Sequence, residues 1–346
     1  MVQGPAGHRR ELSQEAAGGL PVVVDAMGGD RAPAEIVAGA RQAAEEGLAV
    51  ALVGDPDCIA DAGDLMIFPA SEVIGMHDDA ARAVRTKKDS SLVRAAEAVR
   101  DGKAAAMVSA GNTGATMASA LLRMGRIRGV GRPAIATIIP VPGASPTILL
   151  DAGANSECSP AWLVQFAQMG SAFTRQRFGL DRPRVGLLSI GEEQTKGTPL
   201  VKETHELLAG GAAGVTVDFV GNVEGRDIMT DEVDVVVTDG FTGNVVLKTL
   251  EGSLKFAMNA VLAAMNATDE AKEASRVLLP ALLPLADELD PESYGGAALL
   301  GVKGVCVISH GSSSARAILN AVKVAHRAVA DDLVGLLASA ITAPAA

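Results

Sequence analysis

Aromatic residues are scarce in this chain of 346 residues: they make up 3% of it, and Trp162 and Tyr294 are the sole tryptophan and tyrosine. Apolar residues nevertheless reach 48%, so the core must be built mainly from Ala, Val, Leu and Ile. A chain of this length can bury a substantial core, either as one large α/β unit or as two lobes.

Cysteine is also rare. Cys58, Cys158 and Cys306 are odd in number and widely spaced, which argues against a disulfide framework and against a zinc site. A reducing cytoplasm is therefore the expected location. A thiol nucleophile at Cys158 is a minor alternative, because no histidine lies near it in the sequence, and Cys306 is expected to lie in the core.

The chain has no long uninterrupted apolar run and no excess of positive charge. Residues 1–20 lack the apolar core of a secretory signal and are expected to form a flexible leader. The apolar run 277–286 contains Pro280 and Pro284 and is too short to span a bilayer. The formal net charge of −11 disfavours nonspecific binding to nucleic acid.

Two glycine-rich signatures of nucleotide binding are missing, namely Gly-x-Gly-x-x-Gly after the first strand and Gly-x-x-x-x-Gly-Lys-Ser/Thr. Another kind of turn, rich in Gly, Asn, Asp, Ser and Thr, instead follows an apolar run at 25–30, 109–114, 151–155, 238–244 and 309–314. If the preceding strands are parallel, all these turns lie at one edge of the sheet, where open α/β folds bind ligands. Their backbone N–H groups and small polar side chains suit a phosphate or another anion.

The apolar pattern predicts an α/β fold with three αβα layers. Strands are expected at 21–25, 49–53, 104–108, 134–139, 147–150, 185–190, 233–237 and 305–308, and helices at 33–44, 77–100, 115–124, 160–178 and from about 312 to 333. The short turn after 134–139 predicts an antiparallel hairpin within a mostly parallel sheet. We expect one catalytic unit over 21–336, with two lobes around a cleft, and a flexible tail over 337–346.

A protruding helical arm is predicted at 252–292. Its apolar residues are Leu254, Met258, Val261, Leu262 and Met265, followed by Leu278, Leu279, Leu282 and Leu283. So apolar an arm must bury one face against its own core, a second subunit or a membrane surface. The pattern alone favours the core or a dimer contact.

The turn 109–114 is the best candidate for binding an anion, because a helix start there would present free N–H groups and the positive end of the helix dipole. An ordinary tight turn is the alternative. The residues predicted to bind phosphate are Ser109, Gly111, Asn112, Thr113 and Gly114 in this turn, and Thr242, Gly243 and Asn244 in the turn 238–244.

Two further side chains are candidates for the chemistry. His310 is the histidine that lies within one of these turns, and it could donate a proton or bind an oxyanion, or simply bond to the backbone. Lys196, in the acidic loop 191–197, could neutralise a phosphate or pair with a neighbouring glutamate.

Three aspartates, Asp25, Asp151 and Asp239, each end a predicted strand. Together they could bind a divalent metal ion, but capping of the following turn is the commoner use of Asp at such positions. We therefore predict no metal site.

Basic residues gather in two stretches and could receive an acidic partner, although a solvated charged surface is the usual interpretation of such runs. They are Arg82, Arg85, Lys87 and Lys88, together with Arg123, Arg126 and Arg128.

These motifs together resemble the bacterial acyl-acyl carrier protein:phosphate acyltransferase family of phospholipid synthesis. The resemblance runs in order from about Val22 to Val329. The matching segments are Val24-Asp-Ala-Met-Gly-Gly-Asp30, Lys87-Lys-Asp-Ser-Ser91, 109–115, Arg132-Pro-Ala-Ile-Ala136, 151–155, 164–166, 169–171, 182–188, Gly191-Glu-Glu193, Lys196-Gly197, Gly221-Asn222, 238–244, Tyr294-Gly-Gly-Ala297 and His310-Gly311.

The resemblance implies transfer of a long-chain acyl group from acyl carrier protein to inorganic phosphate, giving an acyl phosphate that a membrane glycerol-3-phosphate acyltransferase consumes. It implies a fold similar to phosphotransacetylases and to isocitrate and isopropylmalate dehydrogenases, a homodimer, and no nucleotide or other cofactor. It also implies a cytoplasmic protein that contacts the inner face of the cell membrane through the arm. Because the arm has few basic residues, such contact should depend on apolar insertion.

In such a reaction phosphate is its own nucleophile, so the protein must desolvate it, orient it beside the thioester and stabilise the oxyanion and the departing thiolate. The expected catalytic residues are Lys196, His310, Asn112 and Asp239, and the basic residues above are expected to bind the acyl carrier protein. Two alternatives stay open: a metal- and nicotinamide-dependent hydroxy-acid dehydrogenase on the same fold, and a noncatalytic adaptor for a carrier protein or a lipid surface.

Overall fold

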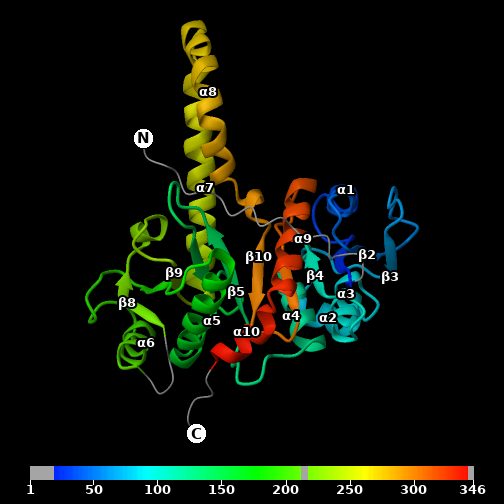
Figure 1. Cartoon of the computed structure of the whole chain (residues 1–346), viewed down its shortest axis with the longest axis horizontal. Coiled ribbons are helices and arrows are strands. Elements are labelled where there is room, and N and C mark those ends of the chain that lie inside the picture. Colours follow the sequence, from blue (N-terminus) through cyan, green and yellow to red (C-terminus); the bar gives the residue numbers. More distant parts are fainter. Residues whose placement is uncertain (1–18, 212–216, 342–346) are drawn as a thin grey trace.

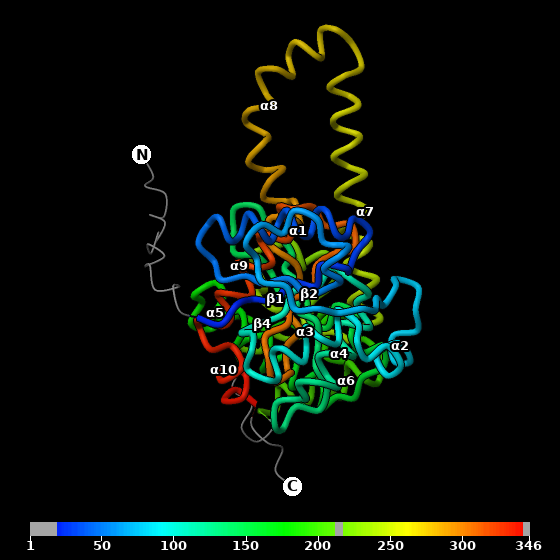
Figure 2. The backbone as a smooth tube through the Cα atoms, turned by 90° about the vertical axis from the view of Figure 1, so that its right-hand side faces the viewer, coloured from blue at the N-terminus to red at the C-terminus, as the bar shows by residue number. Residues whose placement is uncertain are grey.

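A computed structural model describes residues 19–211 and 217–341 and places one twisted sheet between two layers of helices (Figures 1 and 2). The described part of the sheet has 11 strands in the order β3-β2-β1-β4-β11-β10-β5-β6-β9-β7-β8. The strands are β1 (Val22–Asp25), β2 (Val50–Gly54), β3 (Met66–Pro69), β4 (Ala106–Ser109), β5 (Ala134–Ile139), β6 (Thr147–Leu150), β7 (Arg184–Leu188), β8 (Asp218–Val223), β9 (Val235–Val237), β10 (Ala297–Leu300) and β11 (Val305–Ile308). The predicted three-layer αβα fold is confirmed.

The helices divide between the two faces of the sheet. They are α1 (Ala34–Glu45), α2 (Ala80–Thr86), α3 (Ser91–Arg100), α4 (Thr113–Arg123), α5 (Pro160–Phe178), α6 (Pro199–Ala209), α7 (Gly240–Met265), α8 (Asp269–Leu289), α9 (Ala315–Ala330) and α10 (Leu333–Ala340), with 3₁₀ turns η1 (Gly225–Met229) and η2 (Pro291–Tyr294). One face packs against α1, α5, α6, α9 and α10, and the other against α2, α3, α4 and the start of α7. Because helices cover both faces of the sheet, the central strands are buried on both sides and consist mainly of apolar residues, as in Val-Val-Val of β9.

Strand direction reverses in the middle of the sheet. Strands β3, β2, β1, β4 and β11 run parallel to one another, and so do β6, β9, β7 and β8. Between these groups, β10 is antiparallel to both β11 and β5, and β5 is antiparallel to β6. The predicted hairpin of β5 and β6 is thus confirmed.

The same reversals show that the predicted turns do not all share one edge of the sheet. Three antiparallel pairings separate β11 from β6, so the second group of strands runs opposite to the first. The turns 25–30, 109–114 and 309–314 therefore lie at the opposite end of the strands from the turns 151–155 and 238–244. The strands that precede these turns are therefore not all parallel, and the expectation of a single ligand-binding edge is wrong. Residues from the two edges can meet only if another element of the fold runs from one edge to the other.

Some predicted elements differ from the structure. The expected helix 77–100 is two helices, because the Asp89 side chain accepts hydrogen bonds from Ser71 N (3.0 Å) and Ser71 Oγ (2.6 Å) and holds the intervening segment away from the helical path. Strands β3, β8 and β10 were not expected. The first two are edge strands with partly exposed residues, so neither shows a continuous buried run.

The C-terminal boundary of the folded unit also differs from the prediction of a tail beginning at 337. Helix α10 continues to Ala340, and its Leu337 is buried together with Leu333 and Ile341 in the core beneath α5 and α9. Residues 337–341 are thus part of the folded unit, because the apolar side chains of Leu337 and Ile341 pack in its core. Residues 1–18 of the predicted leader 1–20, and residues 342–346 of the predicted tail, lie outside the described residues.

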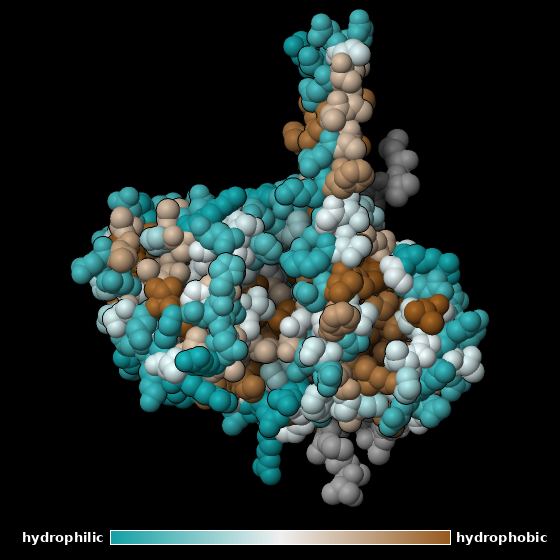
Figure 3. Space-filling model, turned by 180° about the vertical axis from the view of Figure 1, so that it is seen from behind, coloured by the Kyte–Doolittle hydropathy of each residue, from teal (hydrophilic) through white to brown (hydrophobic). Residues whose placement is uncertain are grey.

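The arm projects from the body as a hairpin of α7 and α8 (Figures 1 and 2). Several of its predicted apolar residues are exposed, namely Val261, Leu262, Leu278, Leu279 and Leu283. Its other predicted apolar residues, which are Leu254, Met258, Met265 and Leu282, are partly buried. Figure 3 shows apolar residues along the arm and polar residues at its tip. Packing against its own core is therefore excluded for the exposed residues, and no helix in 19–211 and 217–341 is long and apolar enough to cross a membrane.

Candidate functional site

A cavity of about 180 Å³ lies over the middle of the sheet, beneath α7 and beside η2. Its apolar wall comes mainly from β5, β10 and β11. Its polar lining comes from elements far apart in the sequence and includes Thr113, Asn244, Lys248, Glu251, Ser309 and His310. It is therefore a place where charged and apolar parts of one ligand could lie side by side.

Helix α7 connects the two edges of the sheet at this cavity. It begins at the carboxyl end of β9, where Gly240 N donates to Asn155 O at 2.7 Å. A Cβ atom at Gly243 would lie 1.9 Å from Asp151 O, so only glycine allows this close approach. From Gly240 the helix advances about 12 Å to Lys248, whose Nζ lies 3.3 Å from His310 Nε2 at the end of β11.

The imidazole of His310 is held by the turn that follows it. Its Nδ1 accepts from Ser312 N at 3.3 Å and contacts Ser312 Oγ at 2.8 Å. An Nδ1 that accepts a hydrogen bond leaves the proton on Nε2. The contact between the Lys248 ammonium and Nε2 is a hydrogen bond only in the other tautomer, in which Nε2 accepts. With the proton on Nε2, both groups are donors close together at the cavity, an arrangement that suits an anion able to accept from both.

In the turn 109–114, most of the predicted phosphate-binding residues shape the turn itself. Ser109 is buried, and its Oγ donates to Asp25 Oδ2 at 2.7 Å and accepts from Gly111 N at 3.0 Å. Asn112 caps α4 by accepting from Ala115 N at 3.0 Å, and its Nδ2 donates to Met76 O at 2.9 Å. Gly114 lies against α2.

Thr113 is the residue of this turn that the structure places at the cavity. The side chains of Ser109 and Asn112 point to protein partners, so we do not assign them to phosphate.

The strand-end aspartates also have structural partners. Burial raises the pKa of Asp25, opposed by hydrogen bonds from Ser91, Ser109 and the backbone that follows it. Asp239 caps α7 by accepting from Thr242 N (2.9 Å) and Thr242 Oγ1 (2.8 Å), so these two predicted site residues bond to each other.

Asp151 Oδ1 accepts from the N–H groups of Ile135, Gly153 and Ala154 at 2.9–3.1 Å, and its Oδ2 accepts from Asn155 N and Nδ2 at 2.8 and 2.9 Å. The carboxylate organises the turn 151–155. No group of three or more His, Cys, Asp or Glu residues in the described ranges could hold a metal ion.

Lys196 and Lys248 differ in their relation to the cavity. Lys196 is exposed in the loop after β7, where its N–H donates to Glu193 O at 2.9 Å, and it does not line the cavity. Lys248, which sequence reasoning missed, does line it. A signal was present: Lys248 follows Asn244 by four residues, so both lie on one face of a helix that starts at a predicted ligand turn.

The cysteines are poorly suited to nucleophilic chemistry. Burial raises the pKa of Cys158 to about 12, and burial raises the pKa of Cys306 to about 12 as well. Since the thiolate is the reactive form, neither position supports a covalent thioester intermediate.

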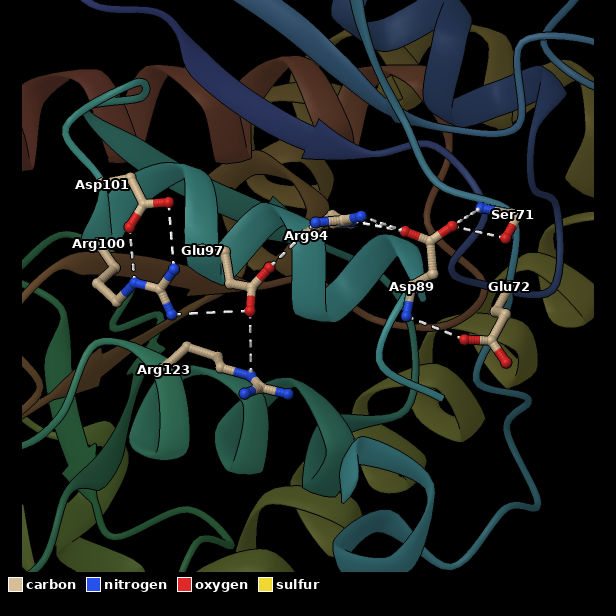
Figure 4. Close-up of polar contacts among 8 residues, drawn as sticks. All are labelled: Ser71, Glu72, Asp89, Arg94, Glu97, Arg100, Asp101 and Arg123. Carbon is tan, nitrogen blue, oxygen red and sulfur yellow. Dashed lines mark hydrogen bonds and ion pairs between the residues drawn. The ribbon is translucent and has the colours of Figure 1, made fainter. Parts of the chain in front are cut away.

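The predicted basic residues separate into paired and unpaired charges. Lys87 forms an ion pair with Asp78 at 2.7 Å, and Arg126 donates to Gly131 O. Arg123 joins a network along α3 through Glu97 at 3.7 Å (Figure 4). In the same network, hydrogen bonds from Ser71 and Arg94 lower the pKa of Asp89 to about 2.

Arg82, Arg85, Lys88 and Arg128 are exposed. Of these, the first three lie on α2 or directly after it. Arg82, Arg85 and Lys88 thus form one exposed basic surface at α2.

Comparison with known proteins places the whole folded unit in one group. A family described as "Fatty acid synthesis protein" matches residues 20–335. A protein of Heliobacterium modesticaldum named phosphate acyltransferase is 47% identical over 328 residues, which cover 92% of this chain and 96% of that protein. A phosphate acyltransferase of Thermobifida fusca is 46% identical over 316 residues, covering 89% of this chain and 87% of the relative.

Solved structures share the fold at much lower identity. The EutD phosphotransacetylase of Staphylococcus aureus has a TM-score of 0.57 at 16% identity and covers 90% of this chain and 94% of its own. A branched-chain phosphotransacylase of Enterococcus faecalis has a TM-score of 0.56 at 14% identity, with 89% and 99% covered. A putative 4-hydroxythreonine-4-phosphate dehydrogenase of Salmonella typhimurium has a TM-score of 0.50 at 12% identity, with 90% and 99% covered. At these identities the likeness shows the fold alone.

Proposed function

The chain belongs to the family of fatty acid synthesis proteins whose members include the phosphate acyltransferases, and we propose that it moves a long-chain acyl group from acyl carrier protein to inorganic phosphate at the cavity beneath α7. The product would be an acyl phosphate for phospholipid synthesis. The observation that carries this assignment is the convergence of Lys248 Nζ and His310 Nε2, 3.3 Å apart, at a cavity with an apolar wall.

The reaction needs an anion and a thioester carbonyl in contact. Phosphate held by Lys248, Thr113 and the first turn of α4 would be oriented beside the carbonyl carbon and shielded from water, and both effects raise its reactivity toward that carbon. A phosphate oxygen forms the new C–O bond, the carbonyl oxygen becomes an oxyanion, and collapse of this intermediate breaks the C–S bond.

His310 is suited to the second half of the step. The Nε2–H group can donate a hydrogen bond to the oxyanion, and the lysine ammonium stabilises the charge on the oxyanion or on the departing thiolate. The thiolate takes up the proton that the phosphate carried, so the products are the acyl phosphate and the free thiol. Asn244, one turn before Lys248 and at the same cavity, offers a further amide donor. Neither nucleotide nor metal enters this scheme.

Acyl-loaded carrier protein incubated with the enzyme and phosphate should release the free carrier thiol at a rate that rises with phosphate. Hydroxylamine should trap the acyl phosphate as hydroxamate. Thiol release that does not depend on phosphate would contradict the proposal. Carrier binding without any turnover would instead identify an adaptor, and reduction of added NAD by a hydroxy acid would identify the dehydrogenase.

The exposed basic residues of α2 are proposed to contact the carrier protein. We expect the double substitution Arg82→Glu, Arg85→Glu to raise KM for the acyl carrier protein about tenfold while KM for phosphate stays unchanged, since two charge reversals across a polar interface act on association. The matched control is Arg182→Glu, an arginine with 80% side-chain exposure beside β7. An equal change in both KM values, or an equal effect of the control, would exclude a carrier site on α2.

We propose that the arm contacts the cytoplasmic face of the membrane, where the product would pass to a glycerol-3-phosphate acyltransferase. Its tip is polar and its apolar residues lie along its length (Figure 3), so the arm should lie in the interface with one side inserted. Leu278 and Leu283, with exposed fractions of 54% and 63%, would supply part of that side.

Substituting Leu278→Asp and Leu283→Asp together should lower co-flotation with phospholipid vesicles at least tenfold, because each charge opposes insertion into the acyl region. Met66→Asp, on the exposed edge strand of the body, is the control and should leave flotation unchanged. If vesicle binding persists in the arm variant and its mass in light scattering falls from two chains to one, the arm is a dimer contact instead.

A further inference from the structure

A carboxylate that sequence reasoning did not single out faces the Lys248 ammonium. Glu251 follows Lys248 by three residues on α7, and its Oε2 lies 2.8 Å from Lys248 Nζ. Both side chains line the cavity, with exposed fractions of 48% for the lysine and 30% for the glutamate. The lysine ammonium thus lies within reach of Glu251 on one side and of His310 on another.

We propose that Glu251 is a positioning residue, which holds the Lys248 ammonium against His310 so that the two donors bind one phosphate or oxyanion. This inference rests on the proposed function. A lysine side chain has four rotatable bonds and loses much rotamer freedom when it is fixed. The ammonium has three N–H donors, so Glu251 can accept one while others remain for an anion.

The other acidic and basic groups at this place have different partners. Glu292, from η2, also lines the cavity, but its two oxygens accept from Ser314 N at 3.3 Å and Ser314 Oγ at 2.6 Å. His310 Nδ1 is held by Ser312. Among the described residues around the cavity, Glu251 is thus the carboxylate within hydrogen-bonding distance of the Lys248 ammonium.

The same kind of pair occurs on the arm without a cavity beside it. Arg276 and Glu273 are also three residues apart on one helix, with 2.7 Å between Nη1 and Oε2. If the Lys248–Glu251 pair only stabilised helix α7, removing it should change the kinetics no more than removing the Glu273–Arg276 pair does. The comparison separates a positioning role from a local structural one.

The test compares Glu251→Gln, Glu251→Asp and the control Glu273→Gln in the phosphate-dependent thiol-release assay. We expect Glu251→Gln to lower kcat/KM for phosphate about tenfold or more, mainly through a higher KM for phosphate, with an unchanged melting temperature. Glu251→Asp, which keeps the charge on a side chain one methylene shorter, should recover part of the loss. Glu273→Gln should match the wild type.

A double-mutant cycle tests whether Glu251 acts through Lys248. In a Lys248→Met background, Glu251→Gln should cost at most about twofold more, because the group that it positions is already absent. Additive losses, or a Glu251→Gln variant with wild-type kinetics, would overturn the proposal. If the wild type itself releases no thiol, the proposed function fails. In that case, calorimetric titration of inorganic phosphate into the wild type and into Glu251→Gln tests the positioning role. Equal affinities of the two proteins for phosphate would exclude it.

Discussion

Replacing Lys248 with methionine is expected to lower kcat/KM for phosphate by about 10²–10³-fold, the usual cost of removing one donor that stabilises charge developing in a transition state. The reason is the position of the ammonium, 3.3 Å from His310 Nε2 at the cavity. Methionine keeps most of the aliphatic length and removes the charge. Because the lysine side chain is 48% exposed, the variant should fold with an unchanged melting temperature.

The measurement is initial-rate kinetics with phosphate and acyl carrier protein varied in turn. The loss should appear in kcat and in KM for phosphate, while KM for the carrier protein stays the same. Lys255→Met is the matched control, since Lys255 is an exposed lysine further along the same helix and outside the cavity lining. Loss of less than about threefold in Lys248→Met would remove this lysine from the mechanism. A large loss in Lys196→Met would then favour the lysine that the sequence alone suggested.

Much of the fold follows from local pattern. The mainly apolar strands β1, β5, β6 and β9 and the helix α5 were predictable, because the residue pattern within each element indicates its type. The reversal of strand direction was less accessible, because β10 is a short Ala-Ala-Leu-Leu segment whose place between β11 and β5 depends on pairing across the chain. A single missed strand of this kind changes which turns share an edge.

The site shows the same division between local and tertiary information. His310 and Thr113 were identified from turns, and the structure places both at the cavity. Ser109 and Asp239 lie in turns of the same type, but their side chains form hydrogen bonds with Asp25 and Thr242, respectively. Sequence cannot distinguish a polar group that faces a ligand from one that organises its own turn, because both uses favour the same residue types.

Asp151→Asn is expected to destabilise the fold by about 2 kcal/mol, and Asp151→Ala by about 3 kcal/mol or more, since loss of the partner leaves buried donors unsatisfied. The Asp151 carboxylate is fully buried and accepts five hydrogen bonds from four residues. Asparagine keeps one acceptor oxygen but turns an NH₂ group toward donors, while alanine keeps neither oxygen.

Urea denaturation followed by circular dichroism measures the free energy of unfolding of each variant. Asp332→Asn is the control, because this aspartate caps α10 from an exposed position through Gly335 N at 3.2 Å, and its replacement should cost less than about 1 kcal/mol. Losses in Asp151→Asn no larger than in the control would contradict a structural role for the buried carboxylate. The turn 151–155 also supports the first turn of α7 through the bond from Gly240 N to Asn155 O. The Asp151 variants should therefore lose turnover together with stability, whereas Lys248→Met should lose turnover alone.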